Sequence, residues 1–422
     1  MAAGPYPCPV PLSDGKPRLI LRRSAQLAVV ALAAGIALHA VGVDLLPSSG
    51  AAEPPPAGGA RARWVEATSA TSAPAHGPGP HPERTLTVLG AGDVLIHPQV
   101  WQQAQRDSSA GGFDFFPMFR QVSETISGAD LALCHMETPL AAPDGPFQGY
   151  PAFSAPPQVL RGVQQAGFDG CSTASNHSID KGEAGVARTI ETFDAAGLGH
   201  TGTFRSAAEA YKPKIYPVQG VKVAHLSYAL GFNGLSRPPG KEWLANRIEP
   251  ATIIAMAKRA RDAGAEIVVL SLHWGTEYQH EPNAYQRNLA RVLLASPDID
   301  VILGHHAHVV QPIEKIGGKW VVYGMGNQLA RHAQPINENR EGIMARLTFT
   351  EEAPERWKVT TIEAIPIWAE LAPDIRLIEP GRVLADPTTP AAQRDTCQGV
   401  MDRIRRHLFT RGAQKAGLVV AG

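Results

Sequence analysis

Residues 266–274 read EIVVLSLHW, a nearly continuous apolar run that ends in a histidine and a tryptophan. A run of this kind is typical of a strand that is buried on both faces of a sheet. Residues 250–263, just before it, are predicted to be helical, and Gly264 follows them as a helix terminator. The segment therefore predicts a helix that leads into an internal strand.

The same alternation of helix and strand signals extends in both directions along the chain. Further strands are predicted at residues 85–92, 131–138, 170–175, 222–230, 300–304 and 319–326. Further helices are predicted at residues 119–126, 157–166, 183–196 and 283–295. This alternation favours an α/β domain in which helices cover internal sheets, and the sequence contains no internal repeat.

Five of the predicted strands are followed at once by a residue that is able to bind a metal ion. In chain order these residues are Asp93 and His97, Glu137, Asn176 and His177, His273, and His305, His306 and His308. In α/β sheets, functional groups gather at the edge where the strands run into loops. The pattern therefore predicts one convergent site.

Each residue taken alone also has a purely structural explanation. Asp93 follows a glycine and suits a turn or a helix cap, and Asn176 suits a cap as well. His273 suits a hydrogen-bonded core histidine, and Glu137 suits a solvated strand end. The coincidence of all of them at strand ends is what favours a site.

The types of side chain indicate which metals would bind. Carboxylate, amide oxygen and imidazole groups are present without thiolate, which suits Mn, Fe or Zn better than Ca or a structural zinc site. The candidates outnumber the ligands of one tetrahedral ion. Two divalent ions about 3.5–4 Å apart, bridged by a carboxylate, would use all of them.

Composition excludes one class of partner and bears on the cysteines. Lys+Arg and Asp+Glu are balanced at 39 each, so the net charge predicts no nucleic-acid partner. Of the four cysteines, Cys8 lies before the apolar stretch near the N-terminus. The odd number that remains argues against a disulfide framework. Cys134 and Cys171 lie in apolar, strand-like runs and are expected to be small core residues rather than metal ligands.

The N-terminal part of the chain indicates export. Residues 1–24 contain four basic residues, and an apolar stretch lies within residues 25–46. A basic flank before an apolar stretch predicts a cytoplasmic N-terminus and export of the remainder. We favour an uncleaved membrane anchor over a cleaved signal at 25–46. The protein is therefore expected at the cell membrane with an extracytoplasmic domain, or secreted.

The remaining boundaries follow from composition. Residues 47–83 are rich in Pro, Ala and Gly and cannot bury enough apolar surface to fold, so they are predicted to form an extended linker. The folded domain is placed at residues 84–411 and a flexible tail at 412–422.

Six stretches make the chain resemble a known family. They are GAGDVLIH (90–97), HMETPL (135–140), SNHSIDKGEAG (175–185), LHWGTEYQHEP (272–282), LGHHAHVVQPIE (303–314) and VYGMGN (322–327). With these motifs the chain resembles the CapA family of poly-γ-glutamate capsule synthesis proteins, within the calcineurin-like metallophosphoesterase superfamily. The resemblance implies a four-layer α/β/β/α sandwich with two central mixed sheets.

The resemblance also implies roles for individual residues. The ligands of two divalent metal ions (Mn, Fe or Zn) would be Asp93, Glu137, Asn176, His273, His306 and His308. His177 would be the catalytic histidine, and Asp180 is placed either to orient it or to cap the following helix. Residues expected to contact the substrate are Trp274, Glu277, Tyr278 and Asn327, with packing as the alternative for the aromatic ones.

The chain departs from the family pattern near two of the proposed ligands. His135-Met136-Glu137 stands where the family has Asn-Leu-Glu, and Leu95 stands where the superfamily's D-x-H motif has its histidine. His135 and His97 are therefore expected either as additional ligands or as supports of neighbouring ligands.

The histidine cluster at residues 305–308 is expected to divide by side-chain direction. His306 and His308 alternate on a segment predicted to be extended, so their side chains should point to the same side. His305 should face away and serve either as an additional ligand or as a support for a neighbour.

Two functions remain open at this point. The first is an envelope-facing, metal-dependent hydrolase or transferase that acts on phosphoester or amide bonds in capsule or wall polymer biosynthesis. Its partner would be an anionic polymer or its precursor, with poly-γ-glutamate suspected, and the N-terminal segment would provide membrane contact. The second is a non-catalytic component that binds or exports the polymer within a membrane-bound polyglutamate synthase complex.

Overall fold

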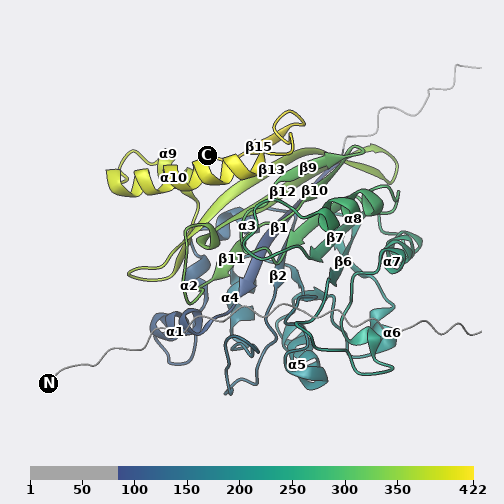
Figure 1. Ribbon diagram of the computed structural model, residues 1–422, viewed down its shortest axis with the longest axis horizontal. Coiled ribbons are helices and arrows are strands. Elements are labelled where there is room, and N and C mark those ends of the chain that lie inside the picture. Colours follow the sequence, from purple (N-terminus) through teal and green to yellow (C-terminus); the bar gives the residue numbers. More distant parts are fainter. Residues whose placement is uncertain (1–83) are drawn as a thin grey trace, which may run out of the picture. The chain divides into compact units, whose positions relative to one another are not determined.

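The computed structural model describes residues 84–422, and Figure 1 shows how its helices and strands are arranged. The expected cytoplasmic segment, anchor or signal, and linker (residues 1–24, 25–46 and 47–83) lie outside the described residues. Among the helices within residues 84–422, none is both long and apolar enough to cross a membrane.

The first of two sheets is mixed and contains the strand that carries Asp93. Its strands are β1 (Thr85–Leu95), β2 (Leu131–Met136), β3 (Gly170–Ser172), β4 (Gly199–Thr201), β11 (Asn327–Ala330), β12 (Glu341–Ala353), β13 (Arg356–Glu370), β14 (Arg376–Ile378) and β15 (Leu418–Val420). Their order is β14-β13-β12-β1-β2-β3-β4, with β11 beside β1 and β15 beside β13. Strands β1 to β4 are parallel, whereas β12, β13 and β14 pair antiparallel.

The second sheet is also mixed and carries the histidine cluster. Its strands are β5 (Lys214–Val218), β6 (Val221–Ala229), β7 (Ile267–His273), β8 (Val301–His305), β9 (Ile313–Ile316) and β10 (Lys319–Val322). Their order is β5-β6-β7-β8-β10-β9, with parallel central strands and antiparallel edges. Strand β7 is buried at every residue, as its continuous apolar run predicts.

Helices lie around both sheets, and several of them cover the outer faces (Figure 1). Their bounds are α1 (Pro98–Asp107), α2 (Phe116–Phe119), α3 (Ser123–Ser127), α4 (Val159–Gln165), α5 (Gly182–Ala195), α6 (Ala207–Ala210), α7 (Pro250–Asp262), α8 (Ala284–Leu294), α9 (Pro380–Ala385) and α10 (Ala391–Leu408). Helix α8 begins at a capping box in which Asn283 and Gln286 bond each other's backbone, which stabilises that end of the helix.

Three apolar clusters define four layers. Residues of both sheets, such as Leu133 and Val269, form one core between the sheets, and α10 adds to it through Ile404. The outer face of the first sheet packs on α1 to α4 through residues such as Phe119, and that of the second packs on α7 and α8 through residues such as Leu293. Each such buried side chain contributes about 1.5–3 kcal/mol. The expected four-layer α/β/β/α sandwich with two mixed sheets is confirmed.

Two local expectations need correction, and some elements were missed. The long antiparallel pair β12–β13 and the helix α10 were not predicted, and the helix expected at 119–126 is divided into α2 and α3. The tail expected to be flexible at 412–422 ends in β15, which pairs in parallel with β13 through Leu418 and Val420. Residues 418–420 of the expected tail are therefore part of the first sheet.

Cys134 and Cys171 form a disulfide rather than lying unpaired in the core. They are directly opposite each other on β2 and β3, with Cα atoms 4.4 Å apart. Both are buried, as expected, but the expectation that they stay unpaired was wrong. The odd number of cysteines after Cys8 did not exclude a disulfide, because two of the three pair and the third, Cys397, is a buried free cysteine in α10.

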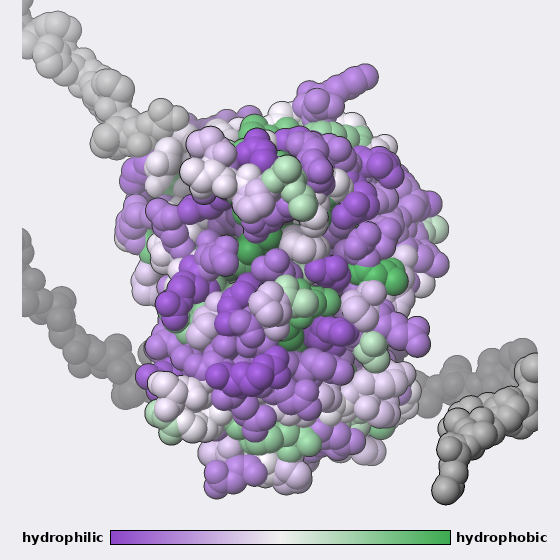
Figure 2. Space-filling view, turned by 90° about the vertical axis from the view of Figure 1, so that its left-hand side faces the viewer, coloured by the Kyte–Doolittle hydropathy of each residue, from purple (hydrophilic) through white to green (hydrophobic). Residues whose placement is uncertain are grey.

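The face of the domain shown in Figure 2 is mostly hydrophilic, and its hydrophobic residues lie in small areas separated by polar ones. A large exposed apolar patch often marks a site for docking to a protein or a membrane. This view of the described domain presents no such patch.

Candidate metal centre

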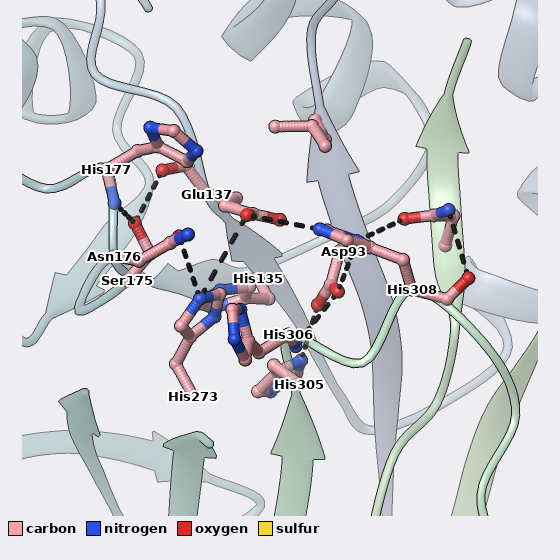
Figure 3. Close-up of polar contacts among 12 residues, drawn as sticks. Asp93, His135, Glu137, Ser175, Asn176, His177, His273, His305, His306 and His308 are labelled. Carbon is pink, nitrogen blue, oxygen red and sulfur yellow. Dashed lines mark hydrogen bonds and ion pairs between the residues drawn. The ribbon is translucent and has the colours of Figure 1, made fainter. Parts of the chain in front are cut away.

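The polar side chains expected to converge lie together where parallel strands of both sheets end (Figure 3). The first sheet provides Asp93, Glu137, Asn176 and His177, and the second provides His273, His305, His306 and His308. The geometric expectation that strand ends bring these residues into one place is therefore met.

Glu137 occupies the middle of this cluster. It is buried, and neither of its carboxylate oxygens has a hydrogen-bond partner among the described residues. Its Oε1 atom lies 3.7 Å from Nε2 of His308 and 4.0 Å from Nε2 of His273, as Figure 3 shows. Burial raises the pKa of Glu137 well above its ordinary value, although His308 opposes the shift. A buried carboxylate with imidazoles on both sides and no hydrogen-bond donor would suit a metal ligand.

Asp93 contacts imidazole rings through both carboxylate oxygens. Oδ1 lies 3.2 Å from Nδ1 of His305, and Oδ2 lies 3.2 Å from Nδ1 of His308. Oδ2 also accepts the backbone N–H of His306 at 3.0 Å. Burial alone would raise the pKa of Asp93, but the hydrogen bonds from His305 and His308 outweigh it and hold that pKa well below its ordinary value. The carboxylate is therefore ionised at neutral pH.

Two glycines allow the backbone segments of the centre to approach one another. A Cβ atom on Gly92 would lie 2.3 Å from the carbonyl oxygen of Gly326, to which the N–H of Asp93 donates at 2.9 Å. A Cβ atom on Gly304 would lie 1.9 Å from the carbonyl oxygen of Tyr323. Only glycine fits at either position, so these two glycines set how closely β1 and β8 approach the loops around the centre.

His306 and His308 lie on a tight loop rather than on an extended segment. Their φ angles are +88° and +54°, in the region that residues other than glycine seldom adopt. Ligand atoms of both rings and of Glu277 lie within 4.8 Å of one another. The two rings do approach a common point, but the explanation by strand alternation was wrong, because the turns of the backbone bring them there.

His177 lies beside the cluster and is held by Asp180. Nδ1 of His177 is 2.7 Å from Oδ2 of Asp180, which also accepts the N–H of Phe153 at 2.8 Å. Because a carboxylate accepts, Nδ1 of His177 carries a proton and Nε2 is left for other contacts. Asp180 does not cap α5, since the N-cap position is Lys181 and no side chain caps that helix.

Asn176 presents its side-chain oxygen to the centre. Oδ1 is 2.9 Å from Nε2 of His273, while Nδ2 donates to Oδ1 of Asn233 at 3.2 Å. The amide nitrogen Nδ2 of Asn233 also lies 3.4 Å from Nδ1 of His177. The sequence analysis missed Asn233, although it lies in the loop after β6, another strand that ends at this edge.

His135 lies beneath the cluster and contacts two of its histidines. Its Nε2 is 3.0 Å from Nδ1 of His273, its Nδ1 is 2.7 Å from Oγ of Ser172, and its ring stacks on His305 at 4.1 Å. Burial lowers the pKa of His135 well below its ordinary value, so the ring is neutral. Donor atoms of His135, Asp93 and His305 also lie within 4.8 Å of one another, so the position suits a support or a ligand. His305 does not face away, because it contacts Asp93 directly.

His97 lies at the rim of the site. Its Nδ1 is 3.2 Å from the carbonyl oxygen of Leu95, and its ring lies 5.5 Å from Phe153 and 4.8 Å from His332. Burial lowers the pKa of His97 to about 4. Within residues 84–422 it belongs to no group of donor atoms close enough to hold a metal. Its neighbour His332 was not singled out from the sequence.

The residues expected to contact the substrate occupy different environments. Trp274 is fully buried and donates its Nε1–H to the carbonyl oxygen of Tyr323 at 2.9 Å, so it packs in the core, which is the alternative that the sequence left open for it. Tyr278 is 47% exposed and lies at the mouth of the site. Asn327 is buried and bonds His308, so it acts behind the centre rather than on its surface.

The donor set is of a kind that can hold divalent cations. Asp93, Glu137 and His308 form one group whose ligand atoms lie within 4.8 Å of one another. His273 and Asn176 lie on the other side of Glu137. The unpartnered oxygens of Glu137 are the structural observation that favours bound cations, because such a carboxylate is costly to bury without them.

Comparison with known proteins agrees with the family resemblance of the motifs. A family model described as "Bacterial capsule synthesis protein PGA_cap" matches residues 87–332. "Capsule biosynthesis protein CapA" of Bacillus anthracis is 27% identical over 275 residues, which cover 63% of this chain and 64% of that protein. "PGA biosynthesis protein CapA" of Bacillus subtilis is 32% identical over 214 residues, which cover 49% of this chain and 53% of that protein. The matched region thus spans less than two thirds of either relative.

Solved structures with a similar fold include two hydrolases. The calcineurin-like phosphoesterase YfkN of Bacillus subtilis aligns with a TM-score of 0.42 and 16% identity, over 77% of this chain and 99% of that one. The NAD nucleotidase of Haemophilus influenzae aligns with a TM-score of 0.41 and 14% identity, over 77% of this chain and 61% of that one. At these scores the likeness says nothing about activity.

Proposed function

Because the chain belongs to the bacterial capsule synthesis protein family PGA_cap, we propose that it is an envelope-facing, metal-dependent hydrolase or transferase of capsule or wall polymer biosynthesis. The proposed substrate is an anionic polymer or its precursor, with poly-γ-glutamate first, since two relatives are named for capsule and PGA biosynthesis. One observation carries the proposal. The buried Glu137 carboxylate has imidazole nitrogens on two sides and no hydrogen-bond partner among the described residues.

The chain would hold two divalent cations, Mn, Fe or Zn, at the edge shared by the two sheets. The proposed ligands are Asp93, Glu137, Asn176, His273, His306 and His308. Such cations supply Lewis-acid polarisation of a phosphoryl or acyl oxygen and make a nucleophilic hydroxide accessible near neutral pH. The protein's contribution is to keep Asp93 ionised and to leave both carboxylate oxygens of Glu137 without hydrogen-bond partners among the described residues, so that they remain available to a cation.

His177 would act as the general acid. Its Nδ1–H is held by Asp180 at 2.7 Å, so Nε2 is the nitrogen free to carry a proton to a leaving group. The ring packs edge-on against Phe153, with centroids 4.7 Å apart, which limits its rotation. Asp180 therefore sets both the tautomer and the direction of His177, because the same oxygen is also fixed by a backbone N–H.

We also propose that the folded domain is exported. The Cys134–Cys171 disulfide supports this, because disulfides persist in oxidising compartments. The basic flank before the apolar stretch within residues 25–46 supports it independently. Protease added to intact cells should cleave the domain. Complete protection would contradict export, whereas a mature form that starts near residue 50 would contradict only the anchor.

Activity assays on the metal-loaded full chain test the proposal. Hydrolysis of a generic phosphomonoester, a phosphodiester and poly-γ-glutamate should be measured beside metal content. Turnover of any of them that requires the metal supports an enzyme. A chain that holds its metals and binds poly-γ-glutamate, but turns over none of the three, would instead be a polymer-binding or export component of a membrane synthase.

A further inference from the structure

Four side chains form a hydrogen-bonded chain that leads from the metal centre to the mouth of the site. Nδ1 of His308 is 3.0 Å from Oδ1 of Asn327, and Nδ2 of Asn327 is 3.1 Å from Nε2 of His332. Nδ1 of His332 is 3.4 Å from the hydroxyl oxygen of Tyr278. His308 and Asn327 are buried, whereas Tyr278 is half exposed, so the chain connects a buried ligand with the surface.

Asn327 sets the direction of the hydrogen bonds. Its Nδ2 also donates to the carbonyl oxygen of Asn339 at 2.8 Å, and a carbonyl oxygen can only accept. The second amide hydrogen is directed to Nε2 of His332, which is nearer than the carbonyl oxygen of His308 at 3.4 Å. The amide therefore cannot be flipped, and Nε2 of His332 must accept from Nδ2. The proton of the neutral His332 ring is then on Nδ1. Burial lowers the pKa of His332 to about 2, which agrees with a neutral ring.

Tyr278 consequently receives a hydrogen bond from inside the protein. Because Nδ1–H of His332 donates to the hydroxyl oxygen, the hydroxyl's own proton is directed elsewhere. The ring centroids of Tyr278 and His308 are 6.1 Å apart. Partial burial raises the pKa of Tyr278, with Glu277 and Glu137 adding to the effect, so the hydroxyl stays protonated.

The backbone holds Tyr278 in an uncommon conformation. Its φ is +60°, and its N–H donates to the carbonyl oxygen of Ala307 at 2.8 Å. Positive φ values at bulky residues are unfavourable and persist where the surrounding structure imposes them, often at functional sites. The loop that carries Tyr278 is thus attached directly to the loop that carries His306 and His308.

We infer that Tyr278 is a dedicated hydrogen-bond donor to an oxygen of the substrate at the metal centre, and that His332 is the positioning residue that holds it. The inference rests on the proposed function, because it assumes that the substrate binds at this centre. It identifies the matching substrate group as an acceptor oxygen of a phosphoryl, carboxylate or amide group. Because His332 donates to the hydroxyl oxygen of Tyr278, it fixes the direction in which the hydroxyl donates its own proton.

Binding of inorganic phosphate to the Mn-loaded full chain tests this inference by calorimetry. Tyr278→Phe should weaken phosphate binding about tenfold or more, the range for one hydrogen bond to a charged group. His332→Leu should weaken it by no more than that factor, and the double variant should match Tyr278→Phe, because both changes act through one hydroxyl. His332→Gln keeps one acceptor and one donor and should recover part of the loss. Tyr285→Phe, at an exposed tyrosine of α8, is the matched control and should bind as wild type.

Metal content and turnover separate the possible failures. All of these variants should retain the wild-type metal content. Loss of metal in His332→Leu with no effect of Tyr278→Phe would mean that the chain supports His308 instead, and would overturn the inference. Wild-type phosphate binding in Tyr278→Phe, or no phosphate binding by the wild type, would overturn it as well. Phosphate binding that depends on Tyr278 and His332, in a chain without turnover, would uphold the inference and contradict the proposed enzyme.

Discussion

Nε2 of His308 lies 3.7 Å from Oε1 of Glu137, and no hydrogen bond joins these two buried side chains. In a tetrahedral site with ligand bonds of about 2.0–2.2 Å, two ligand atoms lie about 3.4 Å apart. The observed separation is close to that value and too long for a hydrogen bond. The pair is therefore already spaced as two ligands of one cation.

The first prediction concerns metal content. The full chain should hold two divalent ions per molecule after loading with Mn or Zn, and Glu137→Ala should remove most of both, since Glu137 lies between the two donor groups. Elemental analysis after desalting measures this. Glu191→Ala, at an exposed position of α5, is the matched control. Less than one metal per wild-type chain would contradict the proposed centre.

The second prediction concerns pH in the metal-free chain. Burial lowers the pKa of His308, but Glu137 and Asp93 outweigh it and raise that pKa to about 10 from an ordinary 6.5. A raised histidine pKa contributes stability that is complete below the unfolded-state value and is lost as pH rises through the folded-state value. The pKa of Glu137 is raised as well and acts in the same direction.

Urea unfolding with a chelator present should therefore show a free energy of unfolding that falls between about pH 6.5 and pH 10. Metal affinity should change in the opposite direction and rise with pH, because His308 must release a proton from Nε2 before it binds a cation. Metal-free stability that rises over this window would mean that His308 is not protonated beside Glu137.

The third prediction separates catalysis from metal binding. His177→Ala should keep the metals and the fold but lose roughly 10²–10⁴-fold in turnover, the range for general acid catalysis. Asn176→Ala should lose metal as well, because its Oδ1 faces His273 at 2.9 Å. Turnover rates and metal content of the two variants are the measurements. Loss of metal in His177→Ala would make this histidine a ligand.

The fourth prediction concerns His135, which replaces the family's asparagine. His135→Asn removes the contact to Nδ1 of His273 at 3.0 Å and should weaken metal binding by about 10-fold to 100-fold, the usual effect of losing a residue that orients a ligand. Competition with a chelator measures the affinity. Complete loss of one metal would indicate a direct ligand, and unchanged affinity would contradict both roles.

The fifth prediction tests the placement of Trp274 in the core. Trp274→Phe removes the Nε1–H bond to the carbonyl oxygen of Tyr323 and part of a fully buried side chain, so it should lower the free energy of unfolding by about 1–3 kcal/mol. KM should not change. Urea denaturation and steady-state kinetics check both parts. A raised KM with normal stability would indicate that Trp274 contacts the substrate.

Much of the fold is readable from local pattern. Strand β7 appears in the sequence as a continuous apolar run because helices and a second sheet exclude water from both of its faces. The ends of β1, β2 and β7 can be located in the same way, so the sequence alone predicts that Asp93, Glu137 and His273 are neighbours. Parallel strands bring their carboxyl ends to one edge, and that rule needs no knowledge of the loops.

The features that the sequence did not reveal depend on pairing between distant segments. Cys134 and Cys171 pair because β2 and β3 are adjacent and in register, which cysteine parity does not encode. His332 contacts Tyr278 across 54 positions of sequence. Its role follows from the path of the loop after β11, which no local periodicity specifies.

The loop that carries His306 and His308 shows most clearly which features can be read from the sequence and which depend on tertiary contacts. The family resemblance and an assumed strand alternation predicted that both rings face the centre, whereas the extended backbone assumed for them was wrong. Their positive φ values are imposed by contacts with Asp93 and with the Tyr278 loop, both remote in sequence. Side-chain chemistry is carried by each residue, but the direction of a side chain depends on backbone angles that are selected by long-range hydrogen bonds and packing.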